Sequence, residues 1–332
     1  MERSIEQPVE ESSATSHTSK TAKLSGIVAL MLLFVASGGL TFAYLSNIQS
    51  APTPPIVQSA SAVAATDPFA SVSLIGKSAY VLDLTTGNIL FSHNADIQLP
   101  LASLTKVMTI LAISQVLPMD TVVTIPSDTP PSATASVLKA GSRWHLQDLI
   151  NFTLIASSNE GAQILADTAN PAIQAKYPGA PQENATLWRM NQLAQQLGLS
   201  KTYFLNPDGL DFSSTQSGAY GSARDVAALL AYVASTSLPV YEATTRDNMT
   251  ITSLDGQKAS AFNTDKALSA ISGLVMGKTG YTDLAGGNLA VVFDVGPAHP
   301  IVAVVMNSTE DGRFSDMKQL VAAAQQSVAQ IH

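Results

Sequence analysis

The chain has 332 residues, a hydrophobic content of 46% and a formal net charge of −8 at pH 7, which is enough for a large core. The acidic balance, with no basic stripe to neutralise phosphates, excludes nucleic acid as a partner. Because cysteine is absent and the five histidines are scattered without metal-ligand spacing, we exclude disulfides and thiolate nucleophiles and expect no metal and no cofactor.

The first segment of the chain predicts attachment to a membrane. Residues 1–23 are polar and aperiodic, which indicates a disordered tail. Residues 24–45 carry no charge and are long enough for one transmembrane helix. A cleaved signal peptide is the alternative, but the apolar run exceeds a typical signal core and no small-x-small site follows closely. Lys20 and Lys23 precede the run and the next basic residue is Lys77, so the N-terminus is expected in the cytoplasm and the remainder outside.

The next segment, 46–74, is rich in Ala, Ser and Pro and is expected to be a linker. One catalytic domain is then predicted over 75–332. It opens with SAYVLDL and ILFSHN around a TTGN turn, which is typical of a β-hairpin.

The middle of this domain, about 103–235, has apolar residues at three- and four-residue steps and is predicted to be mainly helical. Within it, residues 206–209 (NPDG) indicate a turn, and Ser222 with Asp225 resembles a helix capping box. Residues 168–187 contain prolines and are expected to form a long surface loop.

The end of the chain returns to strands, with KTGYT, NLAVVFDV and IVAVVMN, the last two joined by GPAHP. A final helix is predicted over about 313–331. Strands at both ends with helices between them predict an α+β fold, in which a mostly antiparallel sheet is flanked by helices and carries an inserted helical subdomain.

Three short motifs occur in a fixed order. They are Ser103-Leu104-Thr105-Lys106 at a predicted helix start, Ser157-Ser158-Asn159 at a break between two helices, and Lys278-Thr279-Gly280 before the terminal strands. Each triplet alone is weak, because most such matches are helix caps, solvated faces or turns. The ordered combination is far more specific, since β-lactamases and penicillin-binding proteins use this set with a nucleophilic serine.

The first motif indicates nucleophilic catalysis. Residues three apart on a helix lie about 5–6 Å apart at Cβ, so Lys106 can reach the Ser103 hydroxyl. Serine needs a neighbour to take its proton, and lysine can do so only when neutral. The pKa of Lys106 must therefore be lowered by burial or by a nearby cation, for which Lys278 is a candidate.

The other two motifs suit substrate binding and proton transfer. Ser157 is predicted to relay a proton between Lys106 and a leaving amine, and Asn159 to donate to a substrate carbonyl or hold Lys106. Lys278 and Thr279 offer donors to a carboxylate. Gly280 lacks a side chain, which permits a substrate strand to approach the sheet edge.

Over roughly residues 75–320 the chain resembles the low-molecular-mass penicillin-binding proteins, the serine D-alanyl-D-alanine carboxypeptidases. The resemblance includes LASLTKVMT, LIASSNEGAQILA, MNQLAQQLGLSKTYFLNPDGLD and GKTGYTDLAGGNLAVV. It implies a β-lactamase/transpeptidase-like fold, an acyl-enzyme on Ser103, and peptidoglycan stem peptides and β-lactams as partners. It also implies an oxyanion hole formed by the backbone N–H groups of Ser103 and Tyr281. The chain departs from the family at Glu160-Gly161-Ala162, where Asp-Ala-Ala is usual.

The resemblance leaves alternatives open. A DD-endopeptidase would cut peptidoglycan cross-links with the same residues, and a non-catalytic penicillin-binding module would keep the fold without turnover. A class A β-lactamase needs a deacylating glutamate between the second and third motifs. Apart from Glu160, which adjoins the second motif, only Glu183 and Glu242 lie in that interval, and neither has the expected sequence context.

Overall fold

A computed structural model of the chain describes residues 67–127 and 137–330. The predicted cytoplasmic tail, the transmembrane helix and most of the linker lie outside these residues. Within the described ranges, no single helix combines the length and the apolar composition needed to cross a membrane.

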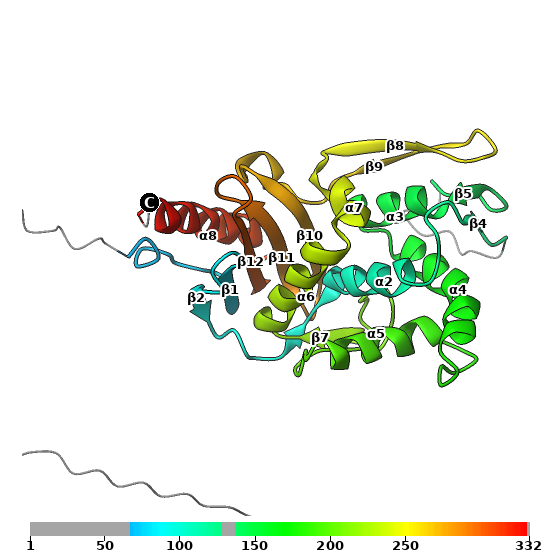
Figure 1. Ribbon diagram of the computed structural model, residues 1–332, viewed down its shortest axis with the longest axis horizontal. Helices are drawn as coiled ribbons and strands as arrows, with labels where there is room; N and C mark the ends of the chain where they lie inside the picture. Colours follow the sequence, from blue (N-terminus) through cyan, green and yellow to red (C-terminus); the bar gives the residue numbers. More distant parts are fainter. Residues whose placement is uncertain (1–66, 128–136, 331–332) are drawn as a thin grey trace, which may run out of the picture. The chain divides into compact units, whose positions relative to one another are not determined.

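A five-stranded antiparallel sheet is formed by strands from both ends of the described chain (Figure 1). The strands are β1 (Ser78–Asp83), β2 (Ile89–His93), β10 (Leu274–Thr282), β11 (Gly286–Asp294) and β12 (Pro300–Ser308). They lie in the order β10-β11-β12-β1-β2, so β10 is an edge strand. Ala79 of β1 is paired with Val305 of β12. This pairing joins two strands that are separated in the sequence by the whole helical insertion.

Both faces of this sheet are buried, and alternate residues of each strand face opposite ways, as the pleat requires. Leu289, Val291 and Phe293 of β11 pack with the C-terminal helix α8 (Gly312–Ala329). Ala290 and Val292 face the other way, toward α6 (Ala223–Thr236) and the helical half. The central strands are thus nearly continuous apolar runs rather than alternating ones.

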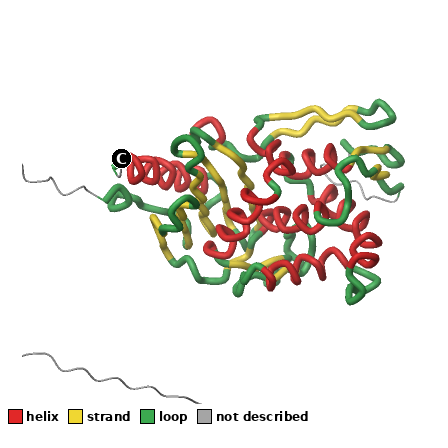
Figure 2. The backbone as a smooth tube through the Cα atoms, in the orientation of Figure 1, coloured by secondary structure: helices red, strands yellow, loops and turns green. Residues whose placement is uncertain are grey.

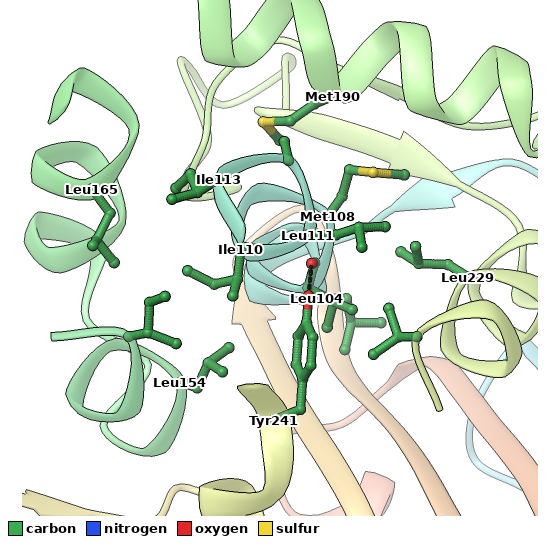
Figure 3. Close-up of a cluster of buried hydrophobic side chains, with 14 of the residues drawn as sticks. Leu104, Met108, Ile110, Leu111, Ile113, Leu154, Leu165, Met190, Leu229 and Tyr241 are labelled. Atoms are coloured by element: carbon green, nitrogen blue, oxygen red, sulfur yellow. Dashed lines mark hydrogen bonds between the residues drawn. The ribbon is translucent and has the colours of Figure 1, made fainter. Parts of the chain in front are cut away.

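The helical half is built around α2 (Thr105–Ser114), which is buried along almost its whole length. Helices α3 (Leu146–Ile155), α4 (Asn159–Lys176) and α5 (Ala185–Gln196) surround it together with α6. Figure 3 shows the aliphatic side chains that converge on α2, and the Tyr241 hydroxyl that donates to the Val107 carbonyl at 2.8 Å. Because α2 has no solvent-exposed face, its position is fixed on every side by packing.

Smaller elements complete the domain (Figure 2). Among the described residues, short strands form three further antiparallel sheets: β3 (Leu99–Pro100) with β6 (Tyr203–Phe204) and β7 (Ala219–Gly221), β4 (Val122–Thr124) with β5 (Arg143–His145), and β8 (Asn248–Thr252) with β9 (Lys258–Phe262). The remaining turns of helix are η1 (Ala102–Leu104), α7 (Leu238–Tyr241), η2 (Glu242–Thr245) and η3 (Leu268–Ala270).

The predicted α+β class, the first hairpin, the helical middle, the terminal strands and the last helix are confirmed. The Ser222 side chain accepts from the Asp225 N–H as an N-cap, while the Asp225 carboxylate accepts from the Lys201 N–H instead of closing the box. Phe69 stacks on Phe91 with ring centroids 5.3 Å apart, so residues before the expected domain start already contact the sheet.

The loop predicted over 168–187 is wrong in its first half. Helix α4 continues through Pro171 to Lys176, and only the segment before α5 is irregular. Proline removes one backbone donor from a helix and crowds the preceding turn. Here Ala169 and Ile173 lie on the buried face on either side of it, and that packing outweighs the local cost.

Candidate active site

The nucleophile turn is the short helix η1 that leads into α2. Ser103 lies in this turn, two residues before α2 begins at Thr105. Ala102, directly before Ser103, has a φ of +48°, a conformation that costs a non-glycine residue about 1–3 kcal/mol. The strained turn holds the Ser103 side chain half-buried at the surface of the domain, where an incoming molecule can reach it.

Lys106 is fully buried and its Nζ lies 2.7 Å from each of three oxygens: Ser103 Oγ, Asn159 Oδ1 and the Asp208 carbonyl. Burial lowers the pKa of Lys106 to about 7, against a smaller opposing effect of the Asp208 charge. A neutral amine has two N–H donors and one lone pair. With the amide and the carbonyl accepting the two donors, the lone pair faces the Ser103 hydroxyl, the geometry a general base needs.

The second motif lies in the break between α3 and α4. Ser158 caps α4 by accepting from the Gly161 N–H at 3.0 Å. A Cβ on Gly161 would lie 2.2 Å from Thr153 Oγ1, so the glycine that departs from the family pattern lets α3 and α4 pack closely. Ser157 has a φ of +56°, a second strained residue at the site.

Lys278 reaches the second motif from β10. Its buried Nζ donates to Ser157 Oγ at 2.8 Å and to the Thr279 carbonyl at 2.9 Å. Burial lowers the pKa of Lys278 well below its usual value, and the charges of Lys106 and Arg313 lower it further. Burial is also the largest cause of the low pKa of Lys106. The repulsion between the two amines therefore lowers mainly the pKa of Lys278.

Gly280 permits β10 to touch the nucleophile turn. A Cβ there would lie 2.9 Å from the Leu101 carbonyl oxygen and 3.2 Å from the Ser103 nitrogen. Real Cβ atoms tolerate such approaches only if the backbone moves, so no other residue fits without displacing Ser103. The contact brings the Ser103 N–H beside Gly280. The next residue on β10, Tyr281, has an exposed side chain.

Thr279 is mostly buried, and its hydroxyl is hydrogen-bonded to the Thr264 hydroxyl. The predicted polar side chains thus form two hydrogen-bonded groups, Lys106 with Ser103 and Asn159, and Lys278 with Ser157. The two groups adjoin at the second motif, which contributes a residue to each. Among the described residues there is no group of three or more His, Asp or Glu side chains arranged to hold a metal ion.

Two contributors were not predicted. The Asp208 carbonyl is positioned by the NPDG turn, in which Gly209 has a φ of +83° and would clash with the Ala102 carbonyl if it carried a Cβ. Arg313, at the start of α8, is buried and donates to the Gly280 carbonyl at 2.7 Å. The Pro-x-Gly spacing of the turn is the only sequence signal for the Asp208 carbonyl. A lone arginine gives no such signal for Arg313.

The chain was compared with known proteins. The family model for D-alanyl-D-alanine carboxypeptidase, peptidase S11, matches residues 62–310. A D-alanyl-D-alanine endopeptidase from Pseudomonas aeruginosa is 33% identical over 170 residues, covering 50% of this chain and 49% of its own. The D-alanyl-D-alanine carboxypeptidase DacA from Escherichia coli is 30% identical over 271 residues, covering 75% of this chain and 61% of its own.

A solved structure agrees with these relatives. Penicillin-binding protein D2 from Listeria monocytogenes, in its ampicillin-bound form, superposes with a TM-score of 0.63 and 27% identity, covering 76% of this chain and 98% of its own. The fold is therefore that of the penicillin-binding proteins. The chain belongs to the D-alanyl-D-alanine carboxypeptidase family. It spans only 49% and 61% of the length of the two curated relatives described above.

Proposed function

We propose that this chain is a serine-type D-alanyl-D-alanine carboxypeptidase that acts on peptidoglycan stem peptides through an acyl-enzyme on Ser103. The observation that carries the proposal is the buried Lys106 amine, 2.7 Å from Ser103 Oγ and with a pKa of about 7. A base with a pKa near the working pH is the most effective proton acceptor.

In the acylation step, Ser103 Oγ attacks the carbonyl carbon of the penultimate D-alanine while the neutral Lys106 accepts the hydroxyl proton. The negative charge that develops on the carbonyl oxygen is bound by the backbone N–H groups of Ser103 and Tyr281. Preformed donors of this kind typically contribute about 10²–10³ in rate. The contact of Gly280 with the nucleophile turn supports this assignment, because it places the two backbone segments side by side.

The leaving amine of the terminal D-alanine then takes the proton as the C–N bond breaks. Ser157 is the proposed relay. Its hydroxyl accepts from Lys278 at 2.8 Å, and its neighbour Asn159 accepts from Lys106, which supports a position of Ser157 close to the Lys106 amine. With its Oδ1 accepting from Lys106, Asn159 has its Nδ2 left to donate to the substrate backbone. Water finally hydrolyses the ester and restores Ser103.

Lys278 and Thr279 are the proposed binding groups for the terminal carboxylate. Both lie on the edge strand β10, and Arg313 adds positive charge behind them. A carboxylate would offset the cost of burying these cations, which have no paired anion in direct contact within the described residues. β-Lactams, which carry a carboxylate and a reactive amide, would acylate Ser103 in the same way.

The proposed site of action is the outer side of a membrane. Residues 24–45 would form one transmembrane helix with the N-terminus in the cytoplasm, and 46–74 would link it to the catalytic domain over 75–332. Peptidoglycan lies on that side, which agrees with the family to which the chain belongs.

A second candidate is a DD-endopeptidase, since the Pseudomonas relative carries that name. A class A β-lactamase is disfavoured because Glu183 and Glu242 are both exposed and neither contacts Ser103, Lys106 or Ser157 by a hydrogen bond. Product analysis separates the first two. A carboxypeptidase releases free D-alanine from a pentapeptide, whereas an endopeptidase converts a cross-linked dimer to monomers.

The test of the nucleophile uses the full-length chain and a penicillin. Intact-mass spectrometry should show one covalent adduct, mapped by peptide digestion to Ser103. Ser103→Ala should give no adduct while its thermal unfolding stays near that of wild type. A folded wild-type protein that forms no adduct would overturn the proposal.

A further inference from the structure

A cavity of about 260 Å³ lies next to the proposed active site. Its walls are α4, the start of α5 and the segment 205–212. The same segment carries the Asp208 carbonyl that accepts from Lys106. The cavity and the Lys106 contact therefore lie on the same short segment of the chain.

The cavity and the active site share one face of α4. Asn159, which contacts Lys106, is followed on that face by Gln163, Asp167 and Asn170, at steps of four, eight and eleven residues. Such steps keep side chains on one side of a helix. At 1.5 Å per residue, this row extends about 16 Å from the second motif.

The polar groups of the cavity are fixed in orientation. Asn170 Oδ1 accepts from the Thr186 N–H at 2.8 Å, while the Thr186 hydroxyl donates to the Ala166 carbonyl at 2.7 Å. The Asn170 Nδ2 is therefore the side that remains to donate. Gln163 Nε2 donates to both Asp167 oxygens at 3.1 Å, which leaves Gln163 Oε1 to accept. Phe212, 58% exposed, adds an aromatic wall.

The segment that lines the cavity is tied to the end of β10. Asp211 accepts from the Thr282 hydroxyl at 3.1 Å and from the Leu284 N–H at 3.2 Å. Residue 212 is therefore tied near the residue that follows Tyr281. If the terminal carboxylate binds at Lys278 and Thr279, as the proposed function requires, the upstream part of the substrate passes Tyr281 toward Phe212.

The length of the stem peptide decides what arrives there. Four extended residues between the scissile bond and the glycan span about 13 Å. The Asp167 carboxylate repels the acidic residues of the stem but accepts from sugar hydroxyls. Amide donors and acceptors beside an aromatic ring suit an acetamido group and the C–H face of a pyranose.

We propose that this cavity is a subsite for the N-acetylated muramyl sugar that carries the stem peptide, an inference that rests on the proposed function. The enzyme would then prefer stems still attached to glycan over free peptides.

The test compares kcat/KM for a free pentapeptide with that for the same peptide on its N-acetylglucosaminyl-N-acetylmuramyl disaccharide. The wild-type chain should favour the disaccharide substrate about five- to tenfold, the effect of one or two net hydrogen bonds and a stacking contact. Asn170→Asp keeps the acceptor for Thr186 and removes the Nδ2 donor, and Phe212→Ala removes the ring. Both variants should lose the preference while the free peptide is cleaved as before.

Phe262→Ala is the matched control, because Phe262 is a 70% exposed phenylalanine on β9, outside the cavity. It should keep the preference. Equal kcat/KM for the two substrates in the wild type, or variants that lower both equally, would overturn the inference.

The proposed function is tested separately by the penicillin adduct on Ser103. If no adduct and no D-alanine release are seen, calorimetry with Ser103→Ala decides the sugar subsite without turnover. Tighter binding of the disaccharide peptide than of the free peptide, lost in Asn170→Asp, supports the subsite. Equal binding of the two ligands refutes it.

Discussion

The rate of acylation should depend on pH through Lys106, and the sign follows from its chemistry. Lys106 accepts a proton only when neutral, and its pKa is lowered to about 7. About a tenth of the amine is neutral at pH 6 and about nine tenths at pH 8. We therefore expect acylation by a fluorescent penicillin, measured in a stopped-flow instrument, to rise about tenfold between these two pH values.

The control is Lys106→Met, which fills a similar buried volume without an amine. Loss of a positioned base typically costs about 10²–10⁴ in rate, and the residual acylation should lack the inflection near pH 7. A flat wild-type profile between pH 5.5 and 8, or an inflection that persists in the methionine variant, would refute the assignment of Lys106 as the base.

The same variant predicts a change in stability. A pKa lowered from 10.5 to about 7 costs the folded state about 4 kcal/mol at pH 7. The variant also loses three hydrogen bonds of about 1 kcal/mol each, so we expect a net stabilisation of about 1 kcal/mol. Since the folded pKa is below the unfolded one, wild-type stability rises with pH from 7 to 10.5. In urea denaturation the advantage of the variant should vanish a little above pH 8, and the wild type should be the more stable by about 2–3 kcal/mol at pH 10.5.

Three further substitutions test contacts that hold the catalytic domain together. Gly280→Ala should reduce the penicillin acylation rate by about 10²-fold, because the added Cβ displaces the nucleophile turn from β10; a rate near wild type would contradict the role given to that contact. Gly209→Ala should be far more destabilising in thermal unfolding than Gly198→Ala, since both glycines have positive φ but only Gly209 has backbone atoms where its Cβ would lie; equal losses would argue against the clash. At Asp83, burial raises the carboxyl pKa, but hydrogen bonds from His299 and from backbone N–H groups outweigh burial and lower it. Asp83→Asn should therefore lose about 1–2 kcal/mol at pH 7, a difference that shrinks as the pH falls below 3.8 and that acid titration of the unfolding free energy measures.

Much of the fold could be predicted because its signals are local. The terminal strands are continuous apolar runs, and the helices of the middle carry periodic apolar residues. Pro171 misled the prediction, since a proline ends most helices and the sequence does not show how strongly Ala169 and Ile173 are packed. The β8–β9 hairpin was missed because only Ile251, Ala259 and Ala261 of its inner face are buried.

For the candidate site, side chains could be predicted and backbone groups could not. Ser103 and Lys106 are three residues apart, so helix geometry alone places them in contact. The Asp208 carbonyl is an acceptor that every residue type possesses, and only the three-dimensional turn selects it. Lys278 was expected near Lys106, but sequence reasoning could not tell that burial would be the main cause of the low Lys106 pKa.

The pairing of β1 with β12 has a consequence for how the protein is made. Residues 79 and 305 meet only after the entire helical insertion has been synthesised, and such long-range pairing is slow because the intervening loop must first be closed. Ser103 and Lys106 belong to the insertion, whereas Lys278 belongs to the sheet. The ability to bind penicillin should therefore be the last property to appear during refolding, after most of the helical circular dichroism has returned. A β-lactam added during refolding would then report the completed tertiary structure rather than the presence of the chain.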